Sequence, residues 1–284
     1  MTGYVARKFH DLHTGLTVEM IATSRGDFVS CQKKTRLRDL VAGNTEKFSY
    51  IPVIEQEKTS EHVVGVLNLE LYFMSPAPDI SAGEAFEQLS ERYLIGSDAS
   101  ILSFILEADH HPFRLLVSDN GIVGLVSLSD LQKLPVRAAL FGLVTELEIA
   151  MTEAIRAKDP DQKRWPSFMS EGRRSSMENR VNLARSKGGI VDELLYTEFC
   201  DKRDILMRLI FREDPRRAQF SKNLREIEDL RNHLAHANDY ADTNEKSAGI
   251  CSVVRDIISI LVVLRPYDAG DPSPGSRLAG PGHI

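Results

Sequence analysis

The chain has 284 residues, a formal net charge of −6 and 42% hydrophobic residues. This length favours two domains, and the composition is ordinary for a soluble globular protein. The acidic balance argues against a surface that coats nucleic acid generally, although it leaves room for a local basic groove. The three cysteines are scattered and form no CxxC pair, so neither a disulfide framework nor a zinc site is indicated.

We expect a cytoplasmic protein with no membrane partner. Unpaired cysteines suit a reducing compartment, and the N-terminal residues lack the apolar core of a signal peptide. The most apolar run, 257–264, follows Arg255 and Asp256. That run is too short to span a bilayer.

The first half of the chain alternates short helices with short strands. Helices are expected at 35–41, 100–108 and 129–133. Strands are expected at 28–31, 50–54, 63–67, 113–117 and 122–126. The Asn120-Gly121 pair between the last two strands predicts a tight hairpin.

Helix, hairpin and short helix occur twice, with a period of roughly 65 residues, as in internal repeats that pack together. We therefore expect a module at 1–135 built from two copies, at about 16–75 and 80–135. After Pro135 the strands stop. The fold class predicted is α+β, an N-terminal α/β module followed by an all-α bundle at 136–267.

The second half begins with one long amphipathic helix, expected at 136–157. Its apolar stripe is wide enough for both the bundle core and a dimer partner, and consists of Leu140, Leu143, Val144, Leu147 and Met151. A polar loop is expected at 158–170. Further helices are expected at 170–186, 190–211, 221–237, capped by Ser221, and 246–264. The tail, 268–284, is rich in Gly and Pro and is expected to be disordered.

The segment from Gly124 to Asp130 joins the end of a strand to the start of a helix. Free backbone N–H groups and the helix dipole at such a junction favour a phosphate. The Ser127 hydroxyl can add a hydrogen bond, and Asp130 offers two acceptor oxygens to the hydroxyls of a ribose. The alternative is structural: Ser127 caps the helix and Asp130 is an acidic residue of its first turn.

The repeat resembles a tandem pair of CBS domains over about residues 16–135. The family pattern of Gly, two apolar residues, Ser or Thr, two variable residues and Asp is matched by Gly124, Ser127 and Asp130. The resemblance implies a regulatory adenosine-type nucleotide such as AMP, ADP or ATP. In the first copy Asn68 replaces the hydroxyl residue and Leu71 replaces the Asp. At most one good site is therefore expected, and a module that only dimerises is the alternative.

The segment Arg231-Asn232-His233-Leu234-Ala235-His236 carries the most chemistry in the second half. On an ideal helix Arg231 lies about 40° from Ile227, inside the apolar stripe. A buried arginine is rare unless paired, so a structural carboxylate, a phosphate or a subunit partner is expected beside it. His236, near the helix end, would otherwise complement the dipole.

Arg231-Asn232 followed by His236 resembles the Arg-polar-x-x-x-His motif of HEPN domains, over about residues 136–267. Many of these helical domains are metal-independent endoribonucleases that act as dimers. The resemblance implies catalytic roles for Arg231, Asn232 and His236, with RNA as substrate and no metal. Arg231 and His236 lie about 140° apart on an ideal helix. Either the helix loosens near His236, or a second copy completes the site.

The sequence thus predicts a nucleotide-responsive, metal-independent endoribonuclease that dimerises. The main rival is a non-catalytic dimeric adaptor. A third possibility is a toxin-like protein silenced by covalent modification, and a separate antitoxin-like partner also remains open. Basic residues upstream form either an RNA-backbone track or a solvated helix face: Arg164, Arg173, Arg174, Arg180, Arg185 and Lys187.

Overall fold

The computed structural model describes residues 13–57, 60–189, 191–236 and 239–268. The chain divides into two units. One is the α/β unit, Leu16–Val136, and the other is the helical unit, which consists of Met1–Gly15 and Arg137–Ile284. Each unit is described by itself.

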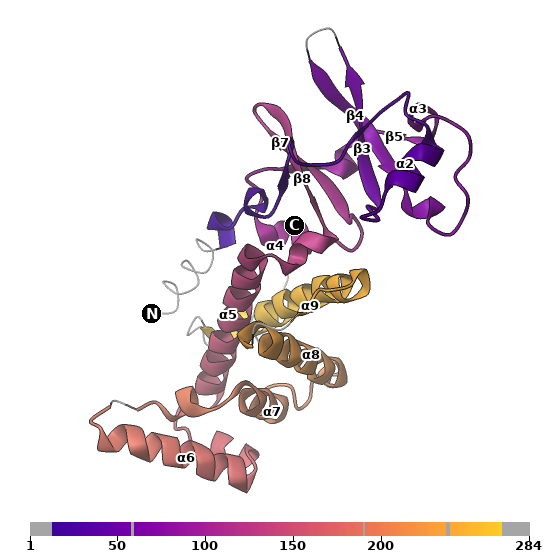
Figure 1. The fold of residues 1–284 in the computed structure, drawn as a ribbon. Coiled ribbons are helices and arrows are strands. Elements are labelled where there is room, and N and C mark those ends of the chain that lie inside the picture. Colours follow the sequence, from indigo (N-terminus) through magenta and orange to yellow (C-terminus); the bar gives the residue numbers. More distant parts are fainter. Residues whose placement is uncertain (1–12, 58–59, 190, 237–238, 269–284) are drawn as a thin grey trace, which may run out of the picture. The chain divides into compact units, whose positions relative to one another are not determined.

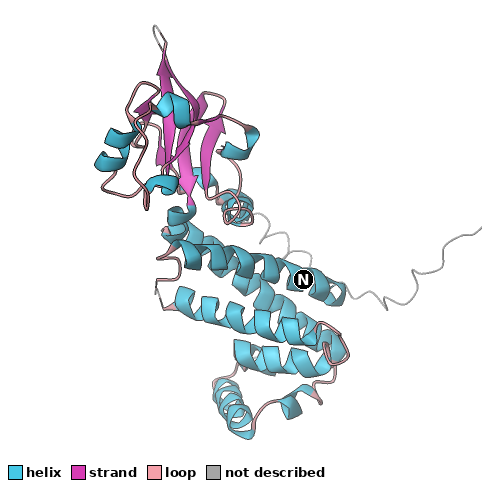
Figure 2. Ribbon diagram, turned by 90° about the vertical axis from the view of Figure 1, so that its right-hand side faces the viewer, coloured by secondary structure: helices cyan, strands magenta, loops and turns pink. Residues whose placement is uncertain are grey.

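The α/β unit contains two four-stranded sheets (Figures 1 and 2). The first has the order β2 (Cys31–Gln32), β3 (Tyr50–Gln56), β4 (Glu61–Asn68) and β5 (Glu87–Gln88). The second has the order β6 (Leu94–Gly96), β7 (Phe113–Ser118), β8 (Gly121–Ser127) and β1 (Thr23–Ser24). In each sheet a central antiparallel hairpin has a parallel strand on one side and an antiparallel strand on the other. The predicted internal repeat is therefore present.

Each repeat contributes its first strand to the sheet of the other repeat. β1 pairs with β8, and β5 pairs with β4. Each pairing depends on a glycine. A Cβ on Gly124 would lie 2.7 Å from the carbonyl oxygen of Thr23, and a Cβ on Gly65 would lie 2.1 Å from the carbonyl oxygen of Glu87. A side chain at either position would push the neighbouring strand away.

Short helices complete the α/β unit. They are α2 (Leu37–Gly43), α3 (Ala82–Ala85) and α4 (Ile101–Ile105), with 3₁₀ turns η1 (Val18–Met20), η2 (Glu70–Tyr72), η3 (Glu91–Tyr93) and η4 (Leu128–Gln132). The predicted strand at 28–31 is wrong except for its last residue. The reason is a turn, since the N–H of Phe28 donates to the carbonyl of Ser24. The predicted hairpin turn is confirmed, with Gly121 at φ 87°.

The helical unit consists mainly of five helices among the described residues (Figure 1). They are α5 (Leu134–Lys158, which begins in the α/β unit), α6 (Glu171–Ser186), α7 (Phe199–Leu209), α8 (Arg217–Ala235) and α9 (Asn244–Asp268). α8 packs against both α7 and α9. The α5 stripe from Leu140 to Met151 is buried within this one chain. The expectation that it also serves a dimer partner is therefore wrong, because the bundle core already uses it. With the α/β unit ahead of these helices, the predicted fold class is confirmed.

Two predicted helix boundaries are wrong. The helix expected at 190–211 is two elements, the 3₁₀ turn η6 (Glu193–Tyr196) and α7. Glu198 and Asp201 form a capping box that starts α7 anew. Ser221 caps nothing, because α8 already begins at Arg217. The loop at 158–170 holds a further turn, η5 (Trp165–Phe168), whose Trp165 is fully buried.

In the part of the chain that the structure describes, one helical segment, Asn244–Arg265, has the length and mean hydropathy (2.0) needed to cross a membrane. The run at 257–264 is therefore part of a longer apolar helix, and the expectation of no membrane partner stays a prediction. In the most apolar 18-residue stretch of this segment, 44% is buried inside the structure. The predicted disorder of the tail falls on 269–284, outside the described residues.

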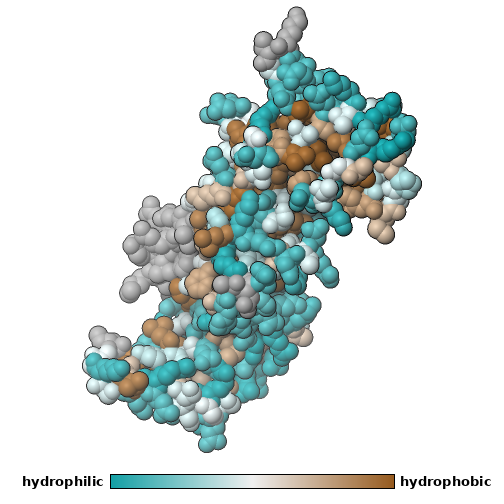
Figure 3. All heavy atoms as spheres, viewed as in Figure 1, coloured by the Kyte–Doolittle hydropathy of each residue, from teal (hydrophilic) through white to brown (hydrophobic). Residues whose placement is uncertain are grey.

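Apolar side chains also reach the surface of both units, as the brown areas in Figure 3 show. In the α/β unit the most exposed large ones are Met74 (96%), Leu134 (76%) and Leu71 (67%). Leu71 is therefore exposed to solvent, whereas Asp130, at the corresponding position of the second repeat, is buried. On α5, Phe141 and Ile149 are exposed, on a different face from the buried stripe.

Candidate functional site

The end of α8 brings Arg231 and Asn232 to the wall of a hollow of about 490 Å³. Three helices supply its lining. Besides Arg231 and Asn232, the lining residues are Arg173 of α6, Glu198, Phe199 and Cys200 at the start of α7, and Glu228 of α8. Two of the three residues predicted to be catalytic therefore share one concave site.

Arg231 is only half-buried, so its predicted place in the core is wrong. The reason is that its side of α8 faces the hollow rather than a packed helix. Its Nη1 donates to Asn232 Oδ1 at 3.4 Å. Among the described residues no carboxylate forms an ion pair with it, in contrast to Arg203, which pairs with Glu228. The guanidinium of Arg231 thus has donors left for an anion in the hollow.

The other charges around the hollow neutralise one another. Arg173 Nη2 lies 2.7 Å from Glu198 Oε2, and its Nε binds Asp201. Arg180 Nη1 lies 3.1 Å from Glu198 Oε1. These hydrogen bonds, first from Arg180 and then from Arg173, lower the pKa of Glu198. The carboxylate is therefore ionised at neutral pH and occupied by its arginines.

The same pairing extends along α6. Arg185 binds Glu193 at 2.7 Å, and Arg174 lies 3.9 Å from Glu178 one turn away. Of the two interpretations of this basic segment, these contacts favour an ion-paired helix face. An RNA-backbone track would have to compete with them for the same guanidinium groups.

His236 does not line the hollow. It is exposed and forms the C-cap of α8, and its backbone N–H donates to the Asn232 carbonyl at 3.1 Å. Because this i to i−4 bond is kept, the helix stays regular up to His236. Arg231 and His236 are therefore not brought together within one chain, as their angular separation predicts.

Gly124, Ser127 and Asp130 lie at the junction of β8 and η4, as expected. Asp130 is 6% exposed, and both of its carboxylate oxygens have partners. Oδ2 accepts from the Ser127 backbone N–H at 2.6 Å and from its hydroxyl at 3.2 Å, while Oδ1 lies 2.7 Å from Lys133 Nζ. The structural alternative, a capping box, is thus present. A ribose at Asp130 would have to displace these partners.

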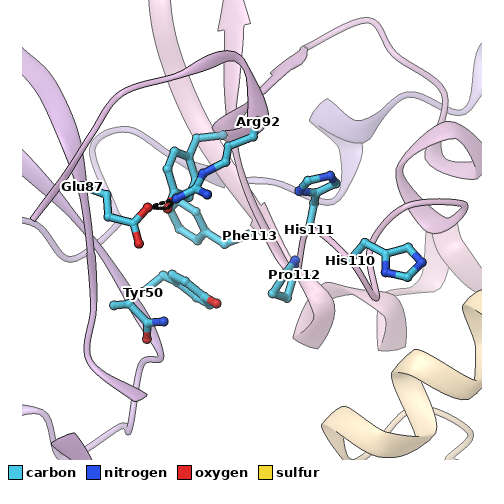
Figure 4. Close-up of a pocket in the computed structure, with 9 residues that line it drawn as sticks. Tyr50, Glu87, Arg92, His110, His111, Pro112 and Phe113 are labelled. Atoms are coloured by element: carbon cyan, nitrogen blue, oxygen red, sulfur yellow. Dashed lines mark hydrogen bonds and ion pairs between the residues drawn. The ribbon is translucent and has the colours of Figure 1, made fainter. Parts of the chain in front are cut away.

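Sequence reasoning missed a cavity of about 250 Å³ that lies between the two repeats of the α/β unit (Figure 4). The first repeat supplies Tyr50 and Asn68, and the second supplies Glu87, Arg92, Tyr93, His110, His111, Pro112 and Phe113. The Tyr50 and Phe113 rings stack with centroids 5.5 Å apart. Asn68, which replaces Ser127 in the first repeat, was the only one of these residues that the motif pattern singled out.

The polar side of this cavity is a connected group. Glu87 pairs with Arg92, and the Tyr93 hydroxyl donates to Glu87 Oε2 at 2.7 Å while accepting from Arg92 Nη2 at 2.8 Å (Figure 4). The Arg92 guanidinium lies 4.7 Å from the Tyr93 ring centroid. Burial raises the pKa of Tyr93 and of Tyr50, and Glu70 raises that of Tyr50 further. Both phenols are therefore neutral donors at neutral pH.

No group of three or more His, Cys, Asp or Glu side chains within the described ranges is placed to hold a metal ion. The expected absence of a metal requirement stays a prediction.

No family model matches the chain, and no curated protein matches it. Several solved CBS structures are similar to its N-terminal part. One is the CBS domain of the bacterial CNNM/CorC family Mg2+ transporter in complex with ATP (22% identity, 45% of this chain and 91% of that one, TM-score 0.34). Another is CBSX2 in complex with AMP (19%, 44% and 97%, TM-score 0.33). A third is a CBS domain-containing protein of unknown function from Bacillus anthracis str. Ames Ancestor (15%, 44% and 96%, TM-score 0.37).

Proposed function

We propose that this chain is a metal-independent endoribonuclease that dimerises and responds to an adenosine-type nucleotide, and that it works in the cytoplasm. One observation carries the proposal. Arg231 has no ion pair among the described residues and lines a hollow together with Asn232, while His236 stands exposed five residues further on.

The chemistry uses the nucleophile that RNA itself supplies. The 2′-hydroxyl oxygen bonds to phosphorus while a ring nitrogen of His236 takes its proton. Arg231 stabilises the added negative charge on the phosphorane, and Asn232 orients the phosphate. The bond from phosphorus to the 5′ oxygen then breaks, and the imidazolium returns its proton to that oxygen. The products are a 2′,3′-cyclic phosphate and a 5′-hydroxyl.

This proposal includes a second copy of the chain. Since His236 lies outside the hollow of its own Arg231, we propose that it acts at the Arg231 of a dimer partner. A two-fold axis then creates two equivalent composite sites.

The decisive experiment incubates the purified full chain with total RNA in EDTA and identifies the ends produced. Wild type should cleave and leave cyclic phosphates, and His236→Ala should be inactive. His233→Ala is the matched control, because His233 is also exposed and its Nδ1 already bonds the Asp229 carbonyl at 2.7 Å. Loss of cleavage on chelation alone would rule out the metal-free mechanism.

The α/β unit has two candidate binding sites for the proposed nucleotide. Asp130 with Ser127 and Gly124 matches the expected pattern. The cavity between the repeats has the aromatic side chains of Tyr50 and Phe113 to pack against a base, and the Arg92 guanidinium, which is shared with Glu87, as a cation for phosphate. Any nucleotide that binds only the folded chain should raise its melting temperature.

The rival function is a non-catalytic dimeric adaptor. Two observations favour it: Asp130 is fully engaged in its capping box, and His236 lies away from the hollow. An adaptor would leave RNA intact in the experiment above at every protein concentration. A separate antitoxin-like partner is compatible with either function.

A further inference from the structure

The end of α8 that carries His236 is held by one arginine of α5. Arg137 donates from Nη1 to the carbonyl oxygens of His233 and Leu234, both at 3.2 Å. Carbonyls in the last turn of a helix run out of intrahelical donors. A cation at this position also complements the negative end of the helix dipole. Arg137 therefore satisfies two acceptors in the turn from which His236 projects.

Arg137 is itself fixed in place. Its guanidinium lies 4.9 Å from the ring centroid of Tyr240, which is 6% exposed. Burial raises the pKa of Tyr240 to about 12, so the phenol is neutral at neutral pH. The face of its ring attracts the Arg137 cation through a cation–π interaction. On either side along α5, Val136 and Leu140 are fully buried. The guanidinium is thus anchored both by its helix and by a ring.

We propose that Arg137 is a positioning residue for His236, and this inference rests on the proposed ribonuclease function. By holding the last turn of α8 against α5, Arg137 sets where the imidazole stands relative to the rest of the bundle. It does not line the hollow of Arg231, so it has no part in holding the phosphate. Arg137 is also the first residue of the helical unit after the α/β unit, on a helix that runs unbroken from Leu134. A movement of the first turn of α5 would therefore reach His236 through this residue.

The first test needs no activity. Backbone amide exchange measured by NMR should be faster at Ala235 and His236 in Arg137→Ala than in wild type, and unchanged at Leu224 in the middle of α8. Arg137→Lys should be intermediate, because an ammonium provides one point donor rather than a planar fork. The control is Arg156→Ala, which removes another α5 arginine whose partners are Glu153 and Asp192, and which should leave His236 unchanged.

The second test follows RNA cleavage. Arg137→Ala should lower kcat about 10- to 100-fold, the cost of a misplaced catalytic group, while KM stays near the wild-type value. Arg137→Lys should recover part of the loss, and Arg156→Ala should cleave like wild type. A parallel fall in binding, with KM rising and kcat unchanged, would contradict a positioning role.

The two readouts separate the possible failures. If wild type cleaves no RNA but exchange at His236 accelerates in Arg137→Ala, the positioning contact stands and the ribonuclease proposal fails. If exchange and kcat in Arg137→Ala match those of Arg156→Ala, the inference is overturned. If Arg137→Ala does not fold, the same two measurements are made on Arg137→Lys. Wild-type amide exchange and wild-type kcat in Arg137→Lys would then overturn the inference.

Discussion

Arg231 lacks the ion pair that the other arginines close to the hollow have. Arg173, Arg180 and Arg203 each bind a carboxylate, whereas the Arg231 guanidinium donates to the Asn232 side chain and forms no ion pair among the described residues. A helical wheel places Arg231 inside the apolar stripe but cannot show that α6 and the start of α7 leave a hollow there. The position of Arg231 around the axis of α8 was predictable from the sequence, but the hollow that it lines was not.

Replacement of Arg231 by lysine tests whether cleavage needs the planar, multi-donor guanidinium or only a positive charge. Arg231→Lys should slow single-turnover RNA cleavage about 100-fold, since removal of one donor to a developing charge typically costs that much. RNA binding, measured by fluorescence anisotropy, should weaken far less because the charge is kept. The control is Arg208→Lys, an exposed arginine of α7. A near wild-type rate for Arg231→Lys would remove this guanidinium from the chemistry.

Asp130 has a structural role whether or not it meets a nucleotide. Asp130→Ala removes the carboxylate that completes the capping box with the N-cap residue Ser127. It should lower the free energy of unfolding by about 0.5–2 kcal/mol, the usual range for a lost capping interaction, measured by urea titration without ligand. It should also lose most of the melting-temperature rise that AMP, ADP or ATP gives to wild type. Asp119→Ala, in the exposed hairpin turn, is the control. If the destabilised variant keeps the full ligand response, the nucleotide lies elsewhere, and the cavity at Tyr50 is the next candidate.

At the scale of elements, what could be predicted was local. The two hairpins, α5 and α6 follow from periodicity and from turn residues close in sequence. β1 and β5 could not be predicted, because each has two residues and pairs with a strand of the other repeat. The break before α7 was signalled by Glu198 and Asp201 at capping-box spacing, but the apolar Leu194 and Leu195 gave the segment a helical appearance. The cavity between the repeats draws on several separate segments, which no local pattern joins.

The contact of α6 with the start of α7 should depend on pH through Glu198. Arg180 and Arg173 lower its pKa, so its stabilising effect is present above the unfolded value of about 4.3 and is lost as pH falls through the folded value. Wild type should therefore melt at a higher temperature than Glu198→Gln at pH 7. The difference should shrink as the pH is lowered below about 4. A difference that stays constant down to pH 3 would mean that the carboxylate charge contributes nothing. Because Glu198 is half exposed, we expect the effect to be small and sensitive to salt.

At the scale of the whole molecule, the question is which copy supplies His236. The α5 stripe expected at a dimer interface is buried in the bundle, so a partner must use other surfaces. Phe141 and Ile149 on α5 and Val262 on α9 are large apolar side chains of the helical unit that lie exposed outside its core. Light scattering at micromolar concentration should show a dimer. A monomer that cleaves RNA would contradict the composite site.

Mixing two inactive variants tests the composite site directly. Arg231→Ala retains His236, and His236→Ala retains Arg231, so a mixed dimer has one site with both groups and one site with neither. At equal amounts, random exchange makes half of the dimers mixed, and two-fold symmetry gives two sites per dimer. Cleavage should therefore return to roughly a quarter of the wild-type rate. Exchange is verified by sequential affinity purification through two different tags. The control mixes Arg231→Ala with the double variant, which can form no complete site and should stay inactive. If mixed dimers form and RNA remains intact while wild type cleaves it, Arg231 and His236 act within one chain, and the end of α8 must rearrange when RNA binds.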